Sequence, residues 1–376
     1  MNAAGWRGLT WDHPRGYRAL EAAARRAAAD GLALTWDRHP LEGFEAHPIA
    51  ELCARYDLVV LDHPHVGEAV AAGCLKPIED LFGADDVARW DAECIGATAA
   101  SYAYAGRHWA LPLDAATQVM ARRPDLVDTP PATWEEVCAL AERQVVALSL
   151  AGPHAILSFQ SICAAVADSA ARPGDDEFVE RGVGREAYRI MTRLVRTSPQ
   201  ALRDANPIAL LEHIASGDGV ALCPLVYGYV NYASRGVAFS DAPRAVPGGR
   251  PGSILGGTGI GISQRAKPSP ALLAHLRWLL SDDAQCGFIP QHEGQPARRS
   301  AWQDAGVNAQ ANGFYAATRE TLEQATLRPR HDGAVAFQAA ASARLREGLF
   351  AEQPAHAVLD DLQPIYERHH AAGAET

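Results

Sequence analysis

At residues 57–62 the chain reads Asp57-Leu58-Val59-Val60-Leu61-Asp62, a run of four apolar residues between two aspartates. A continuous apolar run of this length is typical of a strand in a parallel sheet that is covered on both faces. Two more strands are predicted upstream, at Leu9–Trp11 and Leu32–Trp36, with an alanine-rich helix between them at 17–29. This alternation of strands and helices predicts a doubly wound α/β fold.

The length and composition indicate a globular protein of two lobes. The chain has 376 residues, and single cores stop growing at roughly 250–300 residues. Its hydrophobic content of 48% and charged content of 21% are ordinary for a globular protein. The formal net charge of -11 argues against a nucleic acid partner, which would need a basic face. No apolar run approaches the roughly 18 residues of a membrane span, so direct membrane insertion is not expected.

The cysteines and the N-terminus bear on the compartment. The seven cysteines are scattered without a C-x-x-C pair, at Cys53, Cys74, Cys94, Cys138, Cys163, Cys223 and Cys286. This pattern predicts neither a zinc ribbon nor a disulfide framework, and it favours seven free thiols in a reducing compartment. The N-terminus carries no basic region followed by an apolar region and a cleavage site. The sequence as it stands therefore predicts a cytoplasmic protein, or a periplasmic one whose leader was removed.

Five motif-like segments follow one another along the chain. They are Gly106-Arg107-His108-Trp109-Ala110-Leu111-Pro112, Pro131-Ala132-Thr133-Trp134-Glu135-Glu136-Val137, Gly256-Gly257-Thr258-Gly259-Ile260-Gly261-Ile262-Ser263, Ser281-Asp282-Asp283-Ala284-Gln285 and Gly294-Gln295-Pro296-Ala297-Arg298-Arg299-Ser300-Ala301. Together they resemble segments of the family 1 extracellular solute-binding proteins, the substrate receptors of ABC transporters. The second segment contains a capping box, in which Thr133 and Glu136 start a helix.

The resemblance implies a fold like that of the type II periplasmic binding proteins. Two doubly wound α/β lobes would be joined by hinge strands that cross between them at about 109–119 and 253–263. The first lobe would comprise 1–112 and 258–300, and the second 113–257 and 301–376. A small-molecule ligand would lie in the cleft between the lobes, and closure about the hinge would seal it. If the protein is exported, the resemblance also implies a membrane component of an ABC transporter as a partner.

Two polar loops at the ends of predicted strands are the first candidates for the ligand site. They read Trp11-Asp12-His13-Pro14-Arg15-Gly16 and Asp62-His63-Pro64-His65-Val66-Gly67. Ligands of open α/β sheets bind at the carboxyl ends of the strands, so both loops should face the cleft. The free N–H groups of the helices that follow, together with Arg15, would suit a carboxylate or phosphate. The predicted ligand is therefore a small polar, anionic organic molecule, although Asp12 and Asp62 would also serve as simple helix caps.

Other candidate contacts come from the crossings and the second lobe. Asp114 and Gln118 follow the first crossing, Thr258 lies on the second, and Gln295 precedes the motif at Pro296. The full set of predicted ligand contacts is Trp11, Asp12, His13, Arg15, Asp62, His63, His65, Asp114, Gln118, Tyr227, Tyr229, Thr258 and Gln295.

Two alternatives to an organic ligand stay open at this point. Imidazole, carboxylate and phenolate groups suit iron, so a ferric-type metal site is the first, with the ligand set His13, Asp62, His63, Tyr227 and Tyr229. The tyrosines of that set would also serve as an aromatic packing cluster. The second alternative is a cytoplasmic enzyme on the same scaffold. The sequence has no P-loop, zincin or nucleophile-elbow motif, and it predicts no cofactor.

Overall fold

The computed structural model describes residues 5–167 and 177–374, and it is a mixed α/β structure as predicted. Its strands are β1 (Trp6–Trp11), β2 (Leu34–His39), β3 (Leu58–Leu61), β4 (Ala103–Tyr104), β5 (Arg107–His108), β6 (Leu111–Arg122), β7 (Val145–Val146), β8 (Val220–Tyr227), β9 (Ala238–Ser240) and β10 (Leu255–Ile262). Its helices are α1 (Pro14–Ala29), α2 (Leu41–Ala46), α3 (Ile49–Arg55), α4 (Val66–Ala71), α5 (Glu79–Phe82), α6 (Ala84–Glu93), α7 (Trp134–Ala141), α8 (His154–Val166), α9 (Arg181–Thr197), α10 (Pro207–Ser216), α11 (Pro270–Leu279), α12 (Ile289–Gln291), α13 (Arg299–Gln303), α14 (Ala305–Gln310), α15 (Phe314–Glu323), α16 (Ala334–Phe350) and α17 (Ala355–Ala374).

One long strand, β6, connects the two halves of the main sheet. The strand order is β2-β1-β3-β10-β6-β8-β7, with β9 also paired to β6. The first part of β6, 111–117, pairs antiparallel with β10, whereas 118–122 pairs with β8 and β9. The hydrogen-bonded path is thus continuous through β6, although each half of the sheet uses its own part of that strand. The predicted crossing strands correspond to β6 and β10, which join two α/β lobes.

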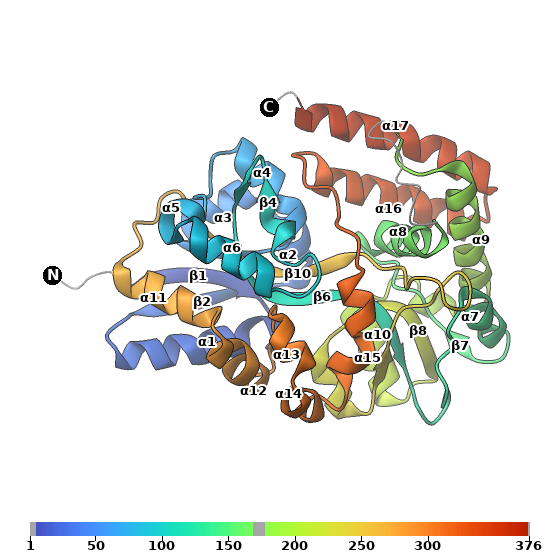
Figure 1. Cartoon of the computed structure of the whole chain (residues 1–376). Coiled ribbons are helices and arrows are strands. Elements are labelled where there is room, and N and C mark those ends of the chain that lie inside the picture. The colour runs from blue at the N-terminus through green and yellow to red at the C-terminus, as the bar shows by residue number, and fades with distance from the viewer. Residues whose placement is uncertain (1–4, 168–176, 375–376) are drawn as a thin grey trace.

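Figure 1 shows the two halves side by side, with β6 and β10 running between them. Helices α1, α3, α4, α5, α6 and α11 surround β1–β3 at one end. At the other end α7, α8, α9 and α10 surround β7 and β8, and the C-terminal helices α16 and α17 pack on each other and against α8 and α9. The last part of the chain therefore returns to the second half of the molecule.

The glycine-rich sequence of β10 permits close contact with its neighbours. Gly257 has a φ of +101°, and a Cβ atom there would lie 2.4 Å from the carbonyl oxygen of Asp114. A Cβ atom on Gly256 would lie 2.4 Å from the ring of Tyr227. The strand therefore passes close to the backbone of β6 and to Tyr227 of β8. Glycine is required here because any side chain would displace β6 or Tyr227.

The predicted helix start at Thr133 is confirmed, and other helices also begin at side-chain caps. Thr133 and Glu136 form the predicted capping box at the start of α7. Ser269 caps α11, and its hydroxyl accepts a hydrogen bond from the N–H of Leu272 at 3.2 Å. Helix α1 begins at Pro14, three residues before the predicted start, because His13 supplies the cap.

The apolar interior is continuous between the lobes. The largest cluster of buried apolar residues includes Trp11 and Leu58 from one half and Val226 and Tyr229 from the other. A second cluster, which includes Trp134 and Phe337, lies within the second half. The expected division of the chain at about 112, 257 and 300 into lobes stays a prediction. In the described ranges, no helix is both long and apolar enough to cross a membrane.

Candidate ligand site between the lobes

Arg15 connects three elements where the two lobes meet. It lies in the first turn of α1, which His13 caps through its Nδ1 atom, 3.2 Å from the backbone nitrogen of Arg15. The Arg15 side chain is only 4% exposed and binds both carboxylate oxygens of Asp114 on β6, with Nε 2.8 Å from Oδ2. Its third nitrogen donates to the carbonyl oxygen of Gly228, just after β8, at 3.1 Å. Burial alone would lower the pKa of Arg15, but the Asp114 carboxylate outweighs it, so the pKa is raised and the guanidinium stays charged.

Aromatic rings from both lobes surround this ion pair. The indole of Trp11 stacks on the imidazole of His13 at a centroid distance of 5.2 Å. Tyr229 meets both rings edge-on, at 5.8 Å from Trp11 and 4.8 Å from His13. The Arg15 guanidinium lies 5.0 Å from the centre of the Tyr229 ring. Burial and the neighbouring Arg15 charge lower the pKa of His13 to about 3, so its imidazole is neutral.

A second buried ion pair joins Asp62 to Arg328. Arg328 lies between α15 and α16 and contacts Asp62, which directly follows β3. Its Nε donates to the carbonyl oxygen of Leu255 on β10 at 3.1 Å, and a third nitrogen lies 3.4 Å from Oε1 of Gln338 on α16. Burial alone would raise the pKa of Asp62, but the Arg328 charge and the hydrogen bonds from His63 and Arg328 together outweigh it, so the pKa is lowered. Burial and Arg328 also lower the pKa of His63 to about 4.

Tyr227 lies between the two ion pairs. Its ring covers Gly256, and the charged groups that influence its hydroxyl include Arg328, Asp62, Glu45 and Arg15. Burial raises the pKa of Tyr227, so the hydroxyl stays protonated and able to donate a hydrogen bond. Among the described residues this hydroxyl has no hydrogen-bond partner, although it is buried. A buried polar group without a partner in the protein is a candidate contact for a ligand or an ordered water.

The first turn of α8 contributes a further contact between the lobes. His154 begins this helix, and its ring lies 5.9 Å from that of Tyr227. Its Nε2 atom lies 3.0 Å from Oε1 of Glu45 on α2, which belongs to the other half of the molecule. The Nδ1 atom of His154 and the indole nitrogen of Trp11 are buried, and neither has a partner in the described part of the chain. These atoms and the Tyr227 hydroxyl are buried polar groups of the site that have no partner among the described residues.

The structure brings together only part of the predicted set. Trp11, His13, Arg15, Asp114 and Tyr229 form one cluster, with Tyr227 next to it. Asp62 and His63 belong to the second ion pair and therefore do not face Arg15 directly. Thr258 is buried on β10, where it is opposite Asp114 in the strand register.

Four predicted contacts have other partners. Asp12 is on the surface, 3.5 Å from Arg38. His65 is buried within the first half, 3.7 Å from Glu68. Gln118 is fully buried against α8, where the Ser161 hydroxyl donates to its carbonyl oxygen at 2.6 Å. Gln295 accepts from the N–H of Val230 and donates to the carbonyl oxygen of Ala115, both at 2.9 Å. The two loops therefore do not form one continuous wall, because Asp12 of the first and His65 of the second contact partners away from the Arg15 cluster.

Arg328, His154 and Glu45 were missed by the sequence reasoning. Arg328 and Asp62 are 266 residues apart in the chain, and no local pattern relates them. Helix α8 is apolar on most of its surface, so nothing in its sequence marks His154 as a cleft residue.

The ferric alternative receives no support from the arrangement of these side chains. Asp62 is paired with Arg328, and His63 is buried behind it. Across residues 5–167 and 177–374, no group of three or more His, Cys, Asp or Glu side chains is arranged to hold a metal ion.

Comparisons with known proteins agree with this geometry. The profile of a family described as bacterial extracellular solute-binding protein matches residues 50–314, well over half of the chain. Among solved structures, maltose-bound MalE3 of T. maritima has a TM-score of 0.79 at 16% identity, with 96% of this chain and 98% of that chain covered. An ABC transporter solute-binding protein from Agrobacterium radiobacter K84, in complex with ribitol, has a TM-score of 0.77 at 20% identity, with 96% and 97% covered. No curated protein sequence matches. The chain belongs to the bacterial extracellular solute-binding protein family.

Proposed function

We propose that this solute-binding protein takes up a neutral, polyhydroxylated small molecule, a sugar or polyol, between Trp11 and Tyr227. One observation carries the proposal: both buried guanidinium groups of the site already have a buried carboxylate partner. The polar groups without a partner there are an indole N–H, a phenol hydroxyl and an imidazole nitrogen, which can each donate or accept a hydrogen bond. Such groups match the hydroxyls of a neutral ligand.

An anionic ligand, which the sequence favoured, would have to compete with Asp114 for Arg15. All three nitrogens of that guanidinium have partners, two in Asp114 and one in Gly228. Displacing Asp114 would leave a carboxylate buried without a partner, which costs several kcal/mol, about 3–5 when one member of a buried pair is lost. A neutral ligand avoids this cost because it leaves the ion pair intact.

The aromatic walls fit the same class of ligand. Trp11 and Tyr229 offer apolar ring surface beside a few polar atoms, and small-molecule sites in general combine these two features. The two structural neighbours were solved with maltose and with ribitol, both neutral and polyhydroxylated. Their likeness to this chain concerns the fold, so it supports the proposal without carrying it.

The proposal also concerns where in the cell the protein acts and which partner it has. Membership of an extracellular solute-binding family favours a location outside the cytoplasmic membrane over the cytoplasmic location that the sequence favoured. In that location the closed protein would deliver its ligand to the membrane component of an ABC transporter. Co-purification with such a component from solubilised membranes, only when the ligand is added, would test this part.

The ligand class is tested with a panel of probes on the purified full chain. The probes are neutral sugars, polyols, sugar acids and ferric ion. Binding is first screened by thermal shift, and the affinity of each probe that binds is then measured by calorimetry. We expect stabilisation by a neutral sugar or polyol, and none by sugar acids or iron. Binding of sugar acids with equal or higher affinity would overturn the neutral assignment, and saturable binding of iron would restore the ferric alternative.

Tyr227→Phe is the variant that connects binding to this site. It removes the unpartnered hydroxyl and keeps the ring over Gly256, so affinity should fall by about 0.5–1.5 kcal/mol, or roughly 2- to 12-fold. Tyr188→Phe is the matched control, because the Tyr188 hydroxyl donates to the carbonyl oxygen of Gln353, away from the site. That control should bind like the parent protein. Equal affinity of the Tyr227→Phe variant and the parent would show that the ligand lies elsewhere.

A further inference from the structure

The backbone of Glu293 has a conformation that is unusual for a residue with a side chain. Its φ is +63°, and it lies just after α12, whose C-cap is His292. The N–H of Glu293 donates to the carbonyl oxygen of Pro290 at 3.2 Å, and the N–H of Gly294 donates to that of Ile289 at 3.0 Å. This pair of hydrogen bonds is the Schellman motif, in which the left-handed residue is usually glycine. Glutamate is disfavoured at that position, so a compensating contact of its side chain is expected.

The Glu293 side chain connects the two halves of the molecule. One carboxylate oxygen forms an ion pair with Arg18 on α1, in the first half. The other accepts a hydrogen bond from the side-chain amide of Asn231 at 2.6 Å, and the Glu293 carbonyl oxygen accepts from the same amide at 3.3 Å. Asn231 belongs to the short helix Val230–Arg235, which follows β8. The contact therefore joins a segment beside α1 to a segment of the second half.

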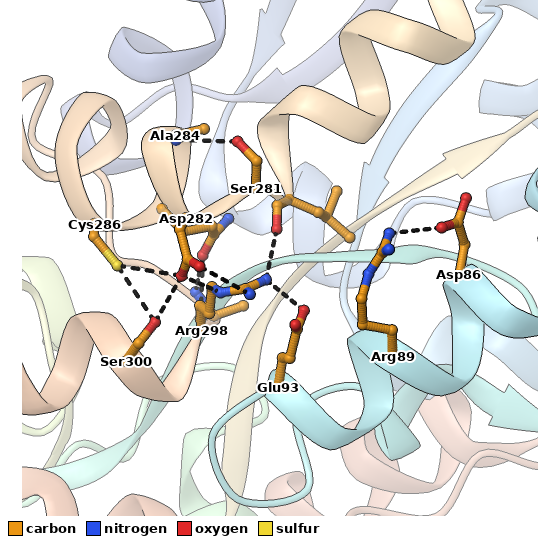
Figure 2. A network of polar contacts seen from close by, with 12 residues as sticks. Asp86, Arg89, Glu93, Ser281, Asp282, Ala284, Cys286, Arg298 and Ser300 are labelled. Atoms are coloured by element: carbon orange, nitrogen blue, oxygen red, sulfur yellow. Dashed lines mark hydrogen bonds and ion pairs between the residues drawn. The ribbon is translucent and has the colours of Figure 1, made fainter.

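The residues that follow Glu293 fix its segment to the first half. Figure 2 shows Arg298 in a polar network with Glu93 of α6 and with Asp282, which follows α11. The Arg298 guanidinium also donates to the carbonyl oxygen of Leu280 at 3.1 Å. The Glu293 side chain therefore has a defined position relative to the first half.

Asn231 is fixed to the second half in a similar way. The next residue, Tyr232, donates from its hydroxyl to Oε1 of Glu212 on α10 at 2.7 Å. Arg235, at the end of the same short helix, also forms an ion pair with Glu212. Helix α10 packs against β8. The contact between Glu293 and Asn231 thus connects two segments that are each fixed to a different half.

We propose that Glu293 is a positioning residue, which holds Tyr229 in the wall of the ligand site by binding Asn231 from the first half. Tyr229 directly precedes the short helix that contains Asn231, and its ring packs edge-on against Trp11 and His13. A hydrogen bond at Asn231 restricts the backbone that carries this ring. Glu293 itself does not touch the aromatic cluster, so it acts through the segment that it binds. The consequence for the ligand rests on the function proposed above.

The residues on either side of Tyr229 are also held from the first half. The carbonyl oxygen of Gly228 accepts from Arg15 at 3.1 Å, and the N–H of Val230 donates to Oε1 of Gln295 at 2.9 Å. Arg15 and Arg18 are three positions apart on α1, so their side chains lie on the same face of the helix. One contacts the segment 228–231 directly, and the other contacts it through Glu293.

A second glutamate provides a matched control, because it has the same conformation but connects elements of one half. Glu352 follows α16 with a φ of +51°. Its N–H donates to the carbonyl oxygen of Leu349 at 3.4 Å, and the N–H of Gln353 donates to that of Gly348 at 2.8 Å, again the Schellman pattern. The Glu352 carboxylate accepts from Nη2 of Arg196 on α9 at 2.8 Å. Helices α9 and α16 contact each other in the second half.

The first test is hydrogen exchange of the full chain without added ligand, measured by mass spectrometry on a peptide that covers residues 228–235. Glu293→Gly removes the carboxylate and relieves the backbone, so the Tm should stay close to that of the parent. The peptide should exchange roughly 2- to 12-fold faster, the range for loss of one hydrogen bond. Glu352→Gly should leave its exchange unchanged. Unchanged exchange in Glu293→Gly, or an equal increase in Glu352→Gly, would overturn the proposal.

Two further variants show whether the contact with Asn231 is responsible. Glu293→Gln keeps an oxygen that accepts from Asn231 and loses only the ion pair with Arg18, whose side chain is 50% exposed. Exposed ion pairs contribute little, so exchange should stay within about 2-fold of the parent. Asn231→Ala should speed exchange at least as much as Glu293→Gly, and the double variant should match Asn231→Ala. Additive effects of the two changes would contradict the proposal, and so would fast exchange in Glu293→Gln.

The same variants test the effect on the ligand site. Maltose and ribitol are the probes, and calorimetry gives their affinities. A probe that binds the parent should bind Glu293→Gly roughly 2- to 12-fold more weakly, and should bind Glu352→Gly with the affinity of the parent. Equal affinities of the parent and Glu293→Gly, despite faster exchange, would overturn the positioning role. Binding of neither probe would count against the proposed function instead, because the exchange experiment needs no ligand.

Discussion

The two buried ion pairs of the interlobe region resemble each other in chemistry and differ in surroundings. In both, an arginine from one part of the chain binds an aspartate beside a crossing strand and also a backbone carbonyl, that of Gly228 or Leu255. Arg15 and Asp114 lie among aromatic rings, whereas Arg328 and Asp62 lie among polar groups that include Gln338 and His63. The difference suggests a division of roles. The Arg15 pair shapes a wall of the proposed ligand site, and the Arg328 pair holds the segment between α15 and α16 against the end of β3 in the first lobe.

The largest effect on stability is expected from removing the ion pair between Arg328 and Asp62. Arg328→Ala leaves the Asp62 carboxylate buried beside a neutral His63, so the free energy of unfolding should fall by about 3–5 kcal/mol. Urea unfolding measures this loss. Arg181→Ala is the control, because Arg181 and its partner Asp360 are about half exposed, and loss of such a pair costs at most about 1 kcal/mol. Similar losses in the two variants would mean that the Arg328 pair has no special role.

The second prediction separates the two pairs by their response to double replacement. Arg15→Ala alone should also cost about 3–5 kcal/mol, because it leaves Asp114 without its partner. Replacing both residues of a pair by apolar ones of similar size should restore most of the stability in each case. Arg328→Met with Asp62→Leu should then bind the best neutral ligand of the panel like the parent protein.

Arg15→Met with Asp114→Leu should recover stability but lose affinity. The guanidinium that holds Tyr229 and Trp11 by cation–π contact is gone, and such contacts contribute about 0.5–2 kcal/mol, or roughly 2- to 30-fold in affinity. Calorimetry on the two double variants gives the comparison directly. Equal affinities would show that the Arg15 pair, like the Arg328 pair, stabilises the fold and does not contribute to ligand binding.

These pairs also indicate how far sequence alone can lead. The strand at 57–62 and the capping box at Thr133 were predictable because each depends on a pattern within about a dozen residues, whereas the crossing strands were predicted from the family resemblance. Arg15 and Asp114 were both named as site residues, yet their pairing was not foreseen, and Arg15 was expected to meet an anion. The pairing joins the first turn of α1 to β6, across 99 residues of sequence. Contacts of this kind decide the charge of the site, and no local pattern contains them.

The third prediction concerns acid sensitivity. Burial lowers the pKa of His13 to about 3 and the pKa of His63 to about 4, and the charges of Arg15 and Arg328, respectively, are the next largest causes. In the unfolded chain, by contrast, a histidine has a pKa near 6.5. Between these values the unfolded chain binds more protons than the folded one, so stability is full above about pH 6.5 and falls as the pH decreases toward 4. For each histidine the slope approaches about 1.4 kcal/mol per pH unit.

His13→Asn separates the His13 contribution from the rest. Asparagine keeps an acceptor for the N–H at the start of α1 but does not titrate in this range. Urea unfolding at pH 7 and at pH 5 should therefore show a smaller difference in the variant than in the parent. A pH dependence as steep as that of the parent would mean that His13 is accessible to protons in the folded protein.

The smallest effect is expected where the lobes touch through Glu45 and His154. This contact, at 3.0 Å, joins α2 of one half to the first turn of α8 in the other, beside the unpartnered Tyr227 hydroxyl. His154 is buried and the Glu45 side chain is only 19% exposed, and glutamine keeps a side-chain oxygen at the same place, so the loss should be about 0.5–1.5 kcal/mol, the value of one hydrogen bond. Because the contact joins the two lobes, Glu45→Gln should mainly speed ligand release, by roughly 2- to 5-fold, and should affect association little.

Glu51→Gln is the matched control, since Glu51 contacts His47 within the same lobe, and ligand release from that variant should not change. Stopped-flow measurement of release from both variants decides the point, and equal release rates would mean that Glu45 and His154 do not hold the lobes together when the ligand is bound.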